Sequence, residues 1–138
     1  MSKNDALKSA VLLTAVDVET RSVLRHLTGW SEVTVKGTVF YQGQFEGWNV
    51  AVAEVGAGNA RAAPIAERAI EHFKPAVALF VGVAGGVKDV ALGDVIVATK
   101  IYGYESGKDE RGGFRPRPDV HNSAHSLEAA RSRITATP

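Results

Sequence analysis

The chain has 138 residues, of which 45% are hydrophobic and 22% charged, and its formal net charge is +1. This length fits one domain with a hydrophobic core, and the small net charge gives no indication of a nucleic-acid or membrane partner. The absence of cysteine excludes disulfides and thiolate metal sites, and neither a signal peptide nor an apolar stretch of transmembrane length is recognisable.

The first part of the chain predicts a strand, a helix and a group of short strands. The apolar residues 10–16 predict a short buried strand. Residues 17–27 have apolar positions at helical spacing and acids at the front, where the helix dipole favours them, so we expect a helix there. Residues 33–35, 38–41 and 48–54 are separated by glycines and predict an antiparallel meander.

A helix over about residues 60–73 and two further strands are expected next. Residues 77–83 form a nearly unbroken apolar run, which predicts a central strand buried on both faces. A second strand is expected over residues 94–101. The combined pattern predicts an α/β fold, a three-layer α/β/α arrangement with a mixed central sheet and helices on its faces.

Three turns follow predicted strands, at residues 17–19, 56–59 and 82–86. In open α/β sheets, ligands bind beyond the carboxyl ends of strands, so we expect these turns to line a pocket at one end of the sheet. The small residues of the third turn let the backbone face a ligand, although a tight structural turn between core strands is an equal alternative. Amides of the second turn open a helix and could hold an anion.

Glu19 allows two interpretations from its position alone. It is an acid in the first turn of a helix, where it stabilises the helix. It also follows a buried strand closely enough to face the pocket, where a carboxylate could orient or deprotonate a water.

The last part of the chain is polar, with Gly and Pro scattered over residues 104–119, and predicts a mobile loop. Arg111, Arg115 and Arg117 in this loop are either a solvated charge run or a lid over an anionic group. A final helix is expected over residues 123–134.

Three segments carry a resemblance to the nucleoside phosphorylase superfamily and, within it, to the methylthioadenosine/S-adenosylhomocysteine nucleosidases. They read TAVDVET, GAGNA and VGVAGGVKDVALGDVIVA, and the resemblance covers residues 11–134. It implies a cytoplasmic homo-oligomer that cleaves the N-glycosidic bond of a small purine nucleoside and needs no metal or other cofactor.

The resemblance also implies roles for individual residues. In the nucleosidases a glutamate after the first strand holds the attacking water, and Glu19 falls on that position. The phosphorylases have an arginine there, and another where this chain has Phe80, so both departures favour hydrolysis. A serine common in the central turn is replaced by Val83. The implied substrate-binding residues are Ala57, Gly58, Val83, Ala84 and Gly85.

The family's domain is considerably longer than this chain. Its ribose-binding Met–Glu motif and its purine-protonating aspartate lie in the second half, whereas Met1 is the only methionine here and no aspartate follows Asp119. We therefore expect residues 1–138 to be the N-terminal part of a nucleosidase-like domain, inactive and self-associating by themselves. The alternatives are a nucleotide- or nucleoside-sensing or interaction module of a larger multidomain protein, and a phosphorolytic purine nucleoside phosphorylase.

Overall fold

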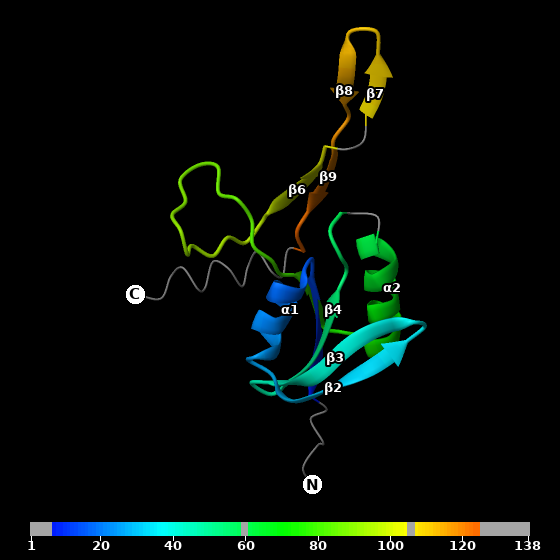
Figure 1. Cartoon of the computed structure of the whole chain (residues 1–138), viewed down its shortest axis with the longest axis vertical. Coiled ribbons are helices and arrows are strands. Elements are labelled where there is room, and N and C mark those ends of the chain that lie inside the picture. The colour runs from blue at the N-terminus through cyan, green and yellow to red at the C-terminus, as the bar shows by residue number, and fades with distance from the viewer. Residues whose placement is uncertain (1–6, 59–60, 105–106, 125–138) are drawn as a thin grey trace. The chain divides into compact units, whose positions relative to one another are not determined.

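A computed structural model describes residues 7–58, 61–104 and 107–124, and it divides the chain into two compact units, Met1–Gly85 and Gly86–Pro138. The first unit is built around a five-stranded sheet, and the second contains two short antiparallel ladders (Figure 1). The elements of the first unit are β1 (Lys8–Thr14), α1 (Asp17–Leu24), β2 (Thr28–Val35), β3 (Thr38–Phe45), β4 (Trp48–Glu54), α2 (Ala62–Phe73) and β5 (Val77–Phe80).

The five-stranded sheet is mixed, with the order β2-β3-β4-β1-β5. Strands β2, β3 and β4 form the predicted antiparallel meander. Strand β1 lies between β4 and β5 and pairs with both of them in parallel. The two parallel pairings give β4, β1 and β5 a common direction, so their carboxyl ends lie at one end of the sheet.

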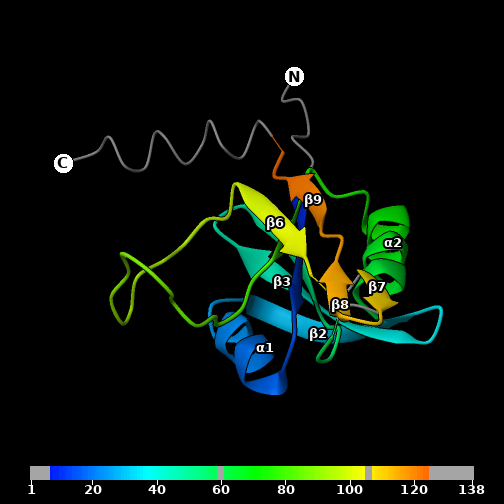
Figure 2. The ribbon, with the colours of Figure 1, turned by 90° about the horizontal axis from the view of Figure 1, so that it is seen from above.

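Side chains alternate between the two faces of β1, and each face is covered by one helix. Val11 and Leu13 belong to the core cluster that packs against α2. Ala10 belongs to the opposite cluster, which contains Leu24 of α1. Figures 1 and 2 show α1 and α2 on opposite sides of the sheet. This alternation, which follows from the two-residue repeat of a strand, confirms the predicted three-layer α/β/α arrangement.

The prediction of a central strand over residues 77–83 was wrong for the described structure. Strand β5 ends at Phe80 and lies at the edge of the sheet, with Leu79 38% and Phe80 60% exposed. The strand predicted over residues 94–101 is also not formed as predicted, since residues 94–99 belong to no strand and the next strand begins at Lys100. An apolar run indicates a buried strand only where a neighbour covers it, and β1 is the only strand that pairs with β5 among the described residues.

The second unit replaces the predicted mobile loop with two ladders. Strand β6 (Lys100–Gly103) pairs with β9 (Asp119–Asn122), and β7 (Gly107–Glu110) forms a hairpin with β8 (Gly113–Pro116). The glycines of this segment lie in or beside the hairpin: Gly107 begins β7, Gly112 is a turn residue, and Gly113, with a positive φ of 113°, begins β8.

The predicted loop arginines lie in or beside this hairpin. The Arg115 Nε lies 3.5 Å from a carboxylate oxygen of Glu110, and all three arginines are exposed, so both interpretations of them stay open. The predicted last helix, residues 123–134, lies outside the described residues except for its first two positions, which are not helical.

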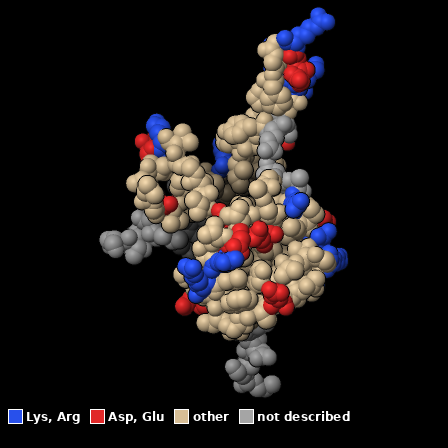
Figure 3. Space-filling model, in the orientation of Figure 1, with Lys and Arg blue, Asp and Glu red and all other residues tan. Residues whose placement is uncertain are grey.

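Charge is mixed over the surface that Figure 3 shows, where acidic and basic side chains are interspersed with uncharged ones. Within the described residues, no helix is long and apolar enough to cross a membrane.

Phe40 is the largest fully buried side chain of the first unit, and its ring meets that of Phe73 edge-on at 5.1 Å between centroids. We expect Phe40→Ala to lower the free energy of unfolding by about 3–5 kcal/mol, because it leaves a cavity between β3 and α2. Urea denaturation followed by circular dichroism measures the loss. The matched control is Val39→Ala on the same strand, 43% exposed, with an expected change within about 0.5 kcal/mol. Equal losses for both variants would contradict this account of the core.

Candidate functional site

The site lies where β4, β1 and β5 end. Backbone hydrogen bonds continue the pairing beyond these strands: the Val55 N–H donates to Thr14 O and the Val81 N–H donates to Leu13 O, both at 2.8 Å. The described residues of the three predicted turns therefore lie at the same end of the sheet, as expected. Glu19 in the first turn of α1 reaches the segment that follows β5.

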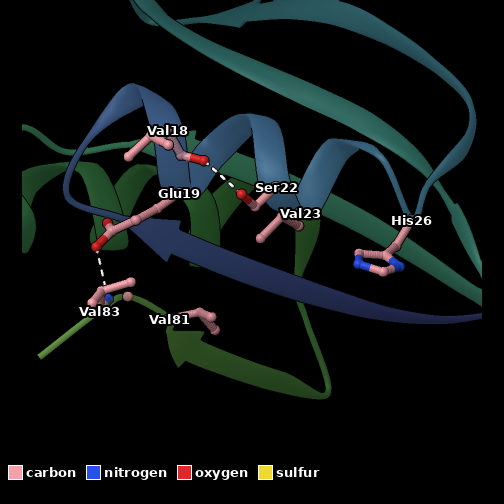
Figure 4. A pocket seen from close by; sticks show the side chains of 8 residues that line it. Val18, Glu19, Ser22, Val23, His26, Val81 and Val83 are labelled. Carbon is pink, nitrogen blue, oxygen red and sulfur yellow. Dashed lines mark hydrogen bonds between the residues drawn. The ribbon is translucent and has the colours of Figure 1, made fainter. Parts of the chain in front are cut away.

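The Glu19 carboxylate accepts three backbone hydrogen bonds. Its Oε2 accepts from the N–H of Ala15 at 2.9 Å and from the N–H of Val16 at 3.2 Å. Its Oε1 accepts from the N–H of Val83 at 2.8 Å, a residue that lies after β5 (Figure 4). One side chain thus joins the β1–α1 turn to the turn that follows β5.

The contact with Val16 is one half of a capping box. Val16 is the N-cap residue of α1, and a valine has no side-chain acceptor for the first N–H groups of the helix. The Glu19 carboxylate still bonds back to the Val16 N–H, which is the reciprocal half of the motif. Both interpretations of Glu19 from the sequence are therefore compatible: it supports the helix start and faces the strand-end turn.

Hydrogen bonding keeps the Glu19 carboxylate ionised. The N–H of Val83, followed by that of Ala15 and, more weakly, that of Val16, lowers the pKa of this carboxyl below its ordinary value, and partial burial opposes them. A carboxylate offers about four acceptor positions, and the three N–H groups occupy three of them. The arrangement leaves room for about one further donor, such as a water molecule.

A hollow of about 340 Å³ lies beside Glu19, between α1 and the segment that follows β5. Most of its surface is apolar. It is lined by Val18, Glu19, Ser22, Val23, His26, Val81, Gly82 and Val83.

Two contacts shape the inside of this hollow. The Ser22 hydroxyl donates to Val18 O at 2.7 Å, so its proton is already used (Figure 4). A Cβ added at Gly82 would lie 2.8 Å from Glu19 Oε1, so a larger residue here would push the carboxylate out of its present position. The hollow therefore places one ionised carboxylate, that of Glu19, beside a mostly apolar surface.

The structure brings together only some of the predicted site residues. Glu19 and Val83 meet, but through the N–H of Val83, whose side chain is 89% exposed. Ala84 and Gly85 continue the same exposed segment, and Ala57 and Gly58 follow β4. None of these four lines the hollow within the described residues, and their substrate-binding role stays a prediction.

Sequence analysis missed Ser22, Val23 and His26 as lining residues. They follow Glu19 by three, four and seven positions, which is the spacing of one helix face, so the expected helix could have indicated them. It also missed the amide donors, Ala15 and Val16, which no side-chain pattern shows. Among the described residues no cluster of His, Cys, Asp and Glu could hold a metal ion.

The lowered pKa of Glu19 predicts a pH dependence of stability. A carboxyl whose pKa is lower in the folded than in the unfolded chain contributes its full stability above the unfolded value, here 4.5, and loses it as the pH falls through the folded value. The stability difference between wild type and Glu19→Gln should therefore be constant above pH 4.5 and shrink below it. Thermal unfolding across this pH range measures it.

The control for this measurement is Ser22→Ala, which removes a hydrogen bond on the same helix without removing a charge. Its difference from wild type should not change over the same pH range. A Glu19→Gln difference that is equally insensitive to pH would show that the three N–H bonds do not favour the ionised carboxylate.

Comparison with known proteins places the chain in a family. The profile of the Phosphorylase superfamily matches residues 9–136. The ATP nucleosidase Cap17 of Escherichia coli (strain KTE188) is 38% identical over 66 residues, covering 46% of this chain and 13% of the relative. The 5'-methylthioadenosine/S-adenosylhomocysteine nucleosidase of Shewanella halifaxensis (strain HAW-EB4) is 28% identical over 137 residues, covering 91% and 60%.

Solved structures agree in fold. The 5'-methylthioadenosine/S-adenosyl homocysteine nucleosidase of Helicobacter pylori, complexed with a pyrrolidinol compound, superposes with a TM-score of 0.78 at 26% identity, covering 95% of this chain and 59% of the other. The S-adenosylhomocysteine nucleosidase of Streptococcus pyogenes gives 0.77 at 20% identity, covering 96% and 58%, and so shows the fold alone.

The chain spans between 13% and 60% of the length of the curated relatives that it matches. Over that span, its resemblance to the methylthioadenosine/S-adenosylhomocysteine nucleosidases is confirmed in sequence and in fold. Because the superfamily profile covers nearly all of the sequence, this chain belongs to the phosphorylase superfamily.

Proposed function

We propose that this chain supplies the water-holding part of a nucleosidase site, which hydrolyses the N-glycosidic bond of a purine nucleoside in the complete polypeptide. The observation that carries the proposal is the Glu19 carboxylate, held by three backbone N–H groups at the carboxyl end of β1. An ionised carboxylate with about one free acceptor position suits a residue that orients a water and takes up its proton.

The proposed reaction separates the purine from the sugar in two events. The bond between the anomeric carbon and the purine nitrogen breaks with its electron pair going to the base, which leaves after protonation. Water then attacks the ribosyl cation and gives up its proton, with Glu19 as the acceptor. Protonation of the purine and contacts with the ribose are assigned, by the family resemblance, to motifs that residues 1–138 do not contain.

Charge supports hydrolysis over phosphorolysis. A phosphate nucleophile would need cations at the site, because its charge is repelled by the Glu19 carboxylate. The residues that line the hollow include no Lys or Arg. Phe80 stands where the phosphorylases have an arginine, and it too is uncharged. A neutral water is the nucleophile that this setting accommodates.

The proposed substrate is an adenine nucleoside with a group attached at the 5′ position. The relatives described above are nucleosidases for 5'-methylthioadenosine and S-adenosylhomocysteine and for ATP. The nucleosidase of Colwellia psychrerythraea is solved in complex with adenine. A second candidate substrate, ATP itself, is favoured by the 38% identity to an ATP nucleosidase. A sensing module that binds the nucleoside without cleaving it is the alternative from another functional class.

Substitution of Glu19 tests the proposed activity in the complete polypeptide. Glu19→Gln keeps the size and can still hydrogen-bond, but it cannot take up a proton as a carboxylate does. We expect base release from methylthioadenosine, S-adenosylhomocysteine or ATP to fall about 10²- to 10⁴-fold with the fold intact. Adenine formation followed by chromatography measures it, and circular dichroism monitors the fold.

The matched control is Asp17→Asn, which removes the other first-turn carboxylate of α1, one that pairs with Arg21 at 2.9 Å on the surface. It should leave turnover nearly unchanged. Full activity of Glu19→Gln would remove Glu19 from the reaction, and no base release from any of the three substrates by the wild type would favour the sensing module.

Residues 1–138 alone are expected to release no base. The ribose-binding and purine-protonating motifs implied by the resemblance are not present in this sequence. Without a proton donor the purine is a poor leaving group, so the ribosyl cation should not form. The assay described for Glu19 measures this directly on the purified 138-residue chain. Adenine release by this chain at a rate above the uncatalysed reaction would show that the missing motifs are dispensable.

Other expectations from the sequence also stay predictions. These are the assignment of residues 1–138 to the N-terminal part of a longer domain, the cytoplasmic location and the homo-oligomer. Among the residues that the structure describes, no strand pairs with the outer edge of β5, and such an edge supports self-association because it offers its backbone N–H and C=O groups to another chain.

A further inference from the structure

Two buried threonines, Thr14 at the end of β1 and Thr20 in α1, form a hydrogen bond across the β1–α1 turn. The hydroxyl oxygens of Thr14 and Thr20 lie 2.6 Å apart, and their residues are 0% and 3% exposed. This is the distance of a strong hydrogen bond between hydroxyls. A buried hydroxyl without a partner is strongly unfavourable, and each of the two hydroxyls has its shortest hydrogen bond with the other.

The pair is also linked to backbone on both sides. Thr20 Oγ1 lies 3.3 Å from the carbonyl oxygen of Val16, the N-cap residue of α1. Thr14 Oγ1 lies 3.5 Å from the carbonyl oxygen of Ala53 in β4. Each hydroxyl has one proton, so one of them donates to the other and the second donates to a carbonyl group. The short chain ties the end of β1 either to the first turn of α1 or to β4.

The two threonines flank the residues that bind the Glu19 carboxylate. Thr14 directly precedes Ala15 and Val16, whose N–H groups donate to Glu19 Oε2. Thr20 directly follows Glu19 on α1. The hydrogen bond between the two hydroxyls therefore joins the two parts of the turn that carry the donors and the acceptor.

We propose that the Thr14–Thr20 hydroxyl pair is a positioning device, which holds the β1–α1 turn so that the Ala15 and Val16 N–H groups point at the Glu19 carboxylate. Its importance for turnover rests on the function proposed for Glu19, but its effect on the geometry of the turn does not. Both threonines act through Glu19 and its donors, and neither lines the hollow.

The test measures the titration of the Glu19 carboxyl by ¹³C NMR in the folded chain. Thr20→Val and Thr14→Val each replace a hydroxyl by a methyl group of similar size. With the turn no longer held, the Ala15 and Val16 bonds loosen, and the pKa of Glu19 should rise towards its ordinary value. Thr20→Ser keeps the hydroxyl and should retain the wild-type pKa.

The matched control is Thr38→Val. It removes the buried hydroxyl of Thr38 on β3, which accepts a hydrogen bond from Arg68 on α2 at 2.8 Å. It should lower the melting temperature and leave the Glu19 titration unchanged. None of these variants alters a charged or titratable side chain of α1 (Asp17, Glu19, Arg21) or of the residues directly after it (Arg25, His26).

An unchanged Glu19 pKa in the folded valine variants would overturn the proposal and leave the pair a structural one. A pKa that rises equally in Thr20→Ser would also overturn it, because the methyl group and not the hydroxyl would then hold the turn. Should Thr20→Val not fold, Thr14→Val and Thr20→Ser provide the same two comparisons. Since the readout is a titration, loss of the proposed hydrolase function would not change its outcome.

Discussion

The site depends first on the position of β1 between β4 and β5. The parallel register places Thr14 opposite Glu54 and Leu13 opposite Phe80, so the chain leaves all three strands at nearly the same level. Because α1 begins directly after β1, its first turn lies next to the segment that follows β5. The contact between Glu19 and the Val83 N–H therefore depends on β1 and β5 being neighbours, whereas the contacts with Ala15 and Val16 are local to the turn.

Glu19 satisfies two separate requirements with one carboxylate. Val16 cannot cap α1 with its own side chain, so the helix needs an acceptor from elsewhere near its start. The segment after β5 has a free N–H at Val83, which also needs an acceptor. The carboxylate bonds to both, and the combined donors keep it ionised. The same contacts stabilise the start of α1 and fix the orientation of the carboxylate. A functional role of Glu19 is therefore distinguished from a structural one only when turnover and melting temperature are measured on the same variant.

Much of the first unit could be predicted from the sequence, since strands β1 to β4, both helices and the common end of the three turns all follow from local patterns. What failed depended on partners that are distant in the sequence. The apolar run at residues 77–83 indicated a central strand, but the described structure pairs β5 on one side only. The polar segment at residues 104–119 indicated a loop, because a hairpin of four-residue strands has too few alternating positions to show a period.

At the site, Glu19 and Val83 could be predicted because each follows a predicted strand. The Ala15 and Val16 donors could not, because they are backbone N–H groups that every residue type except proline supplies.

A site built from backbone donors tolerates changes of side chain. The contact of Val83 with Glu19 is made by its N–H, which every residue except proline supplies. The same holds for Ala15 and Val16. Side chains matter at Glu19 itself, at the Thr14–Thr20 pair proposed to hold the turn, and at Gly82, where a Cβ would displace the carboxylate. A residue whose contribution is a backbone N–H can therefore change type without loss of its contact, whereas a change at Glu19 removes the acceptor itself.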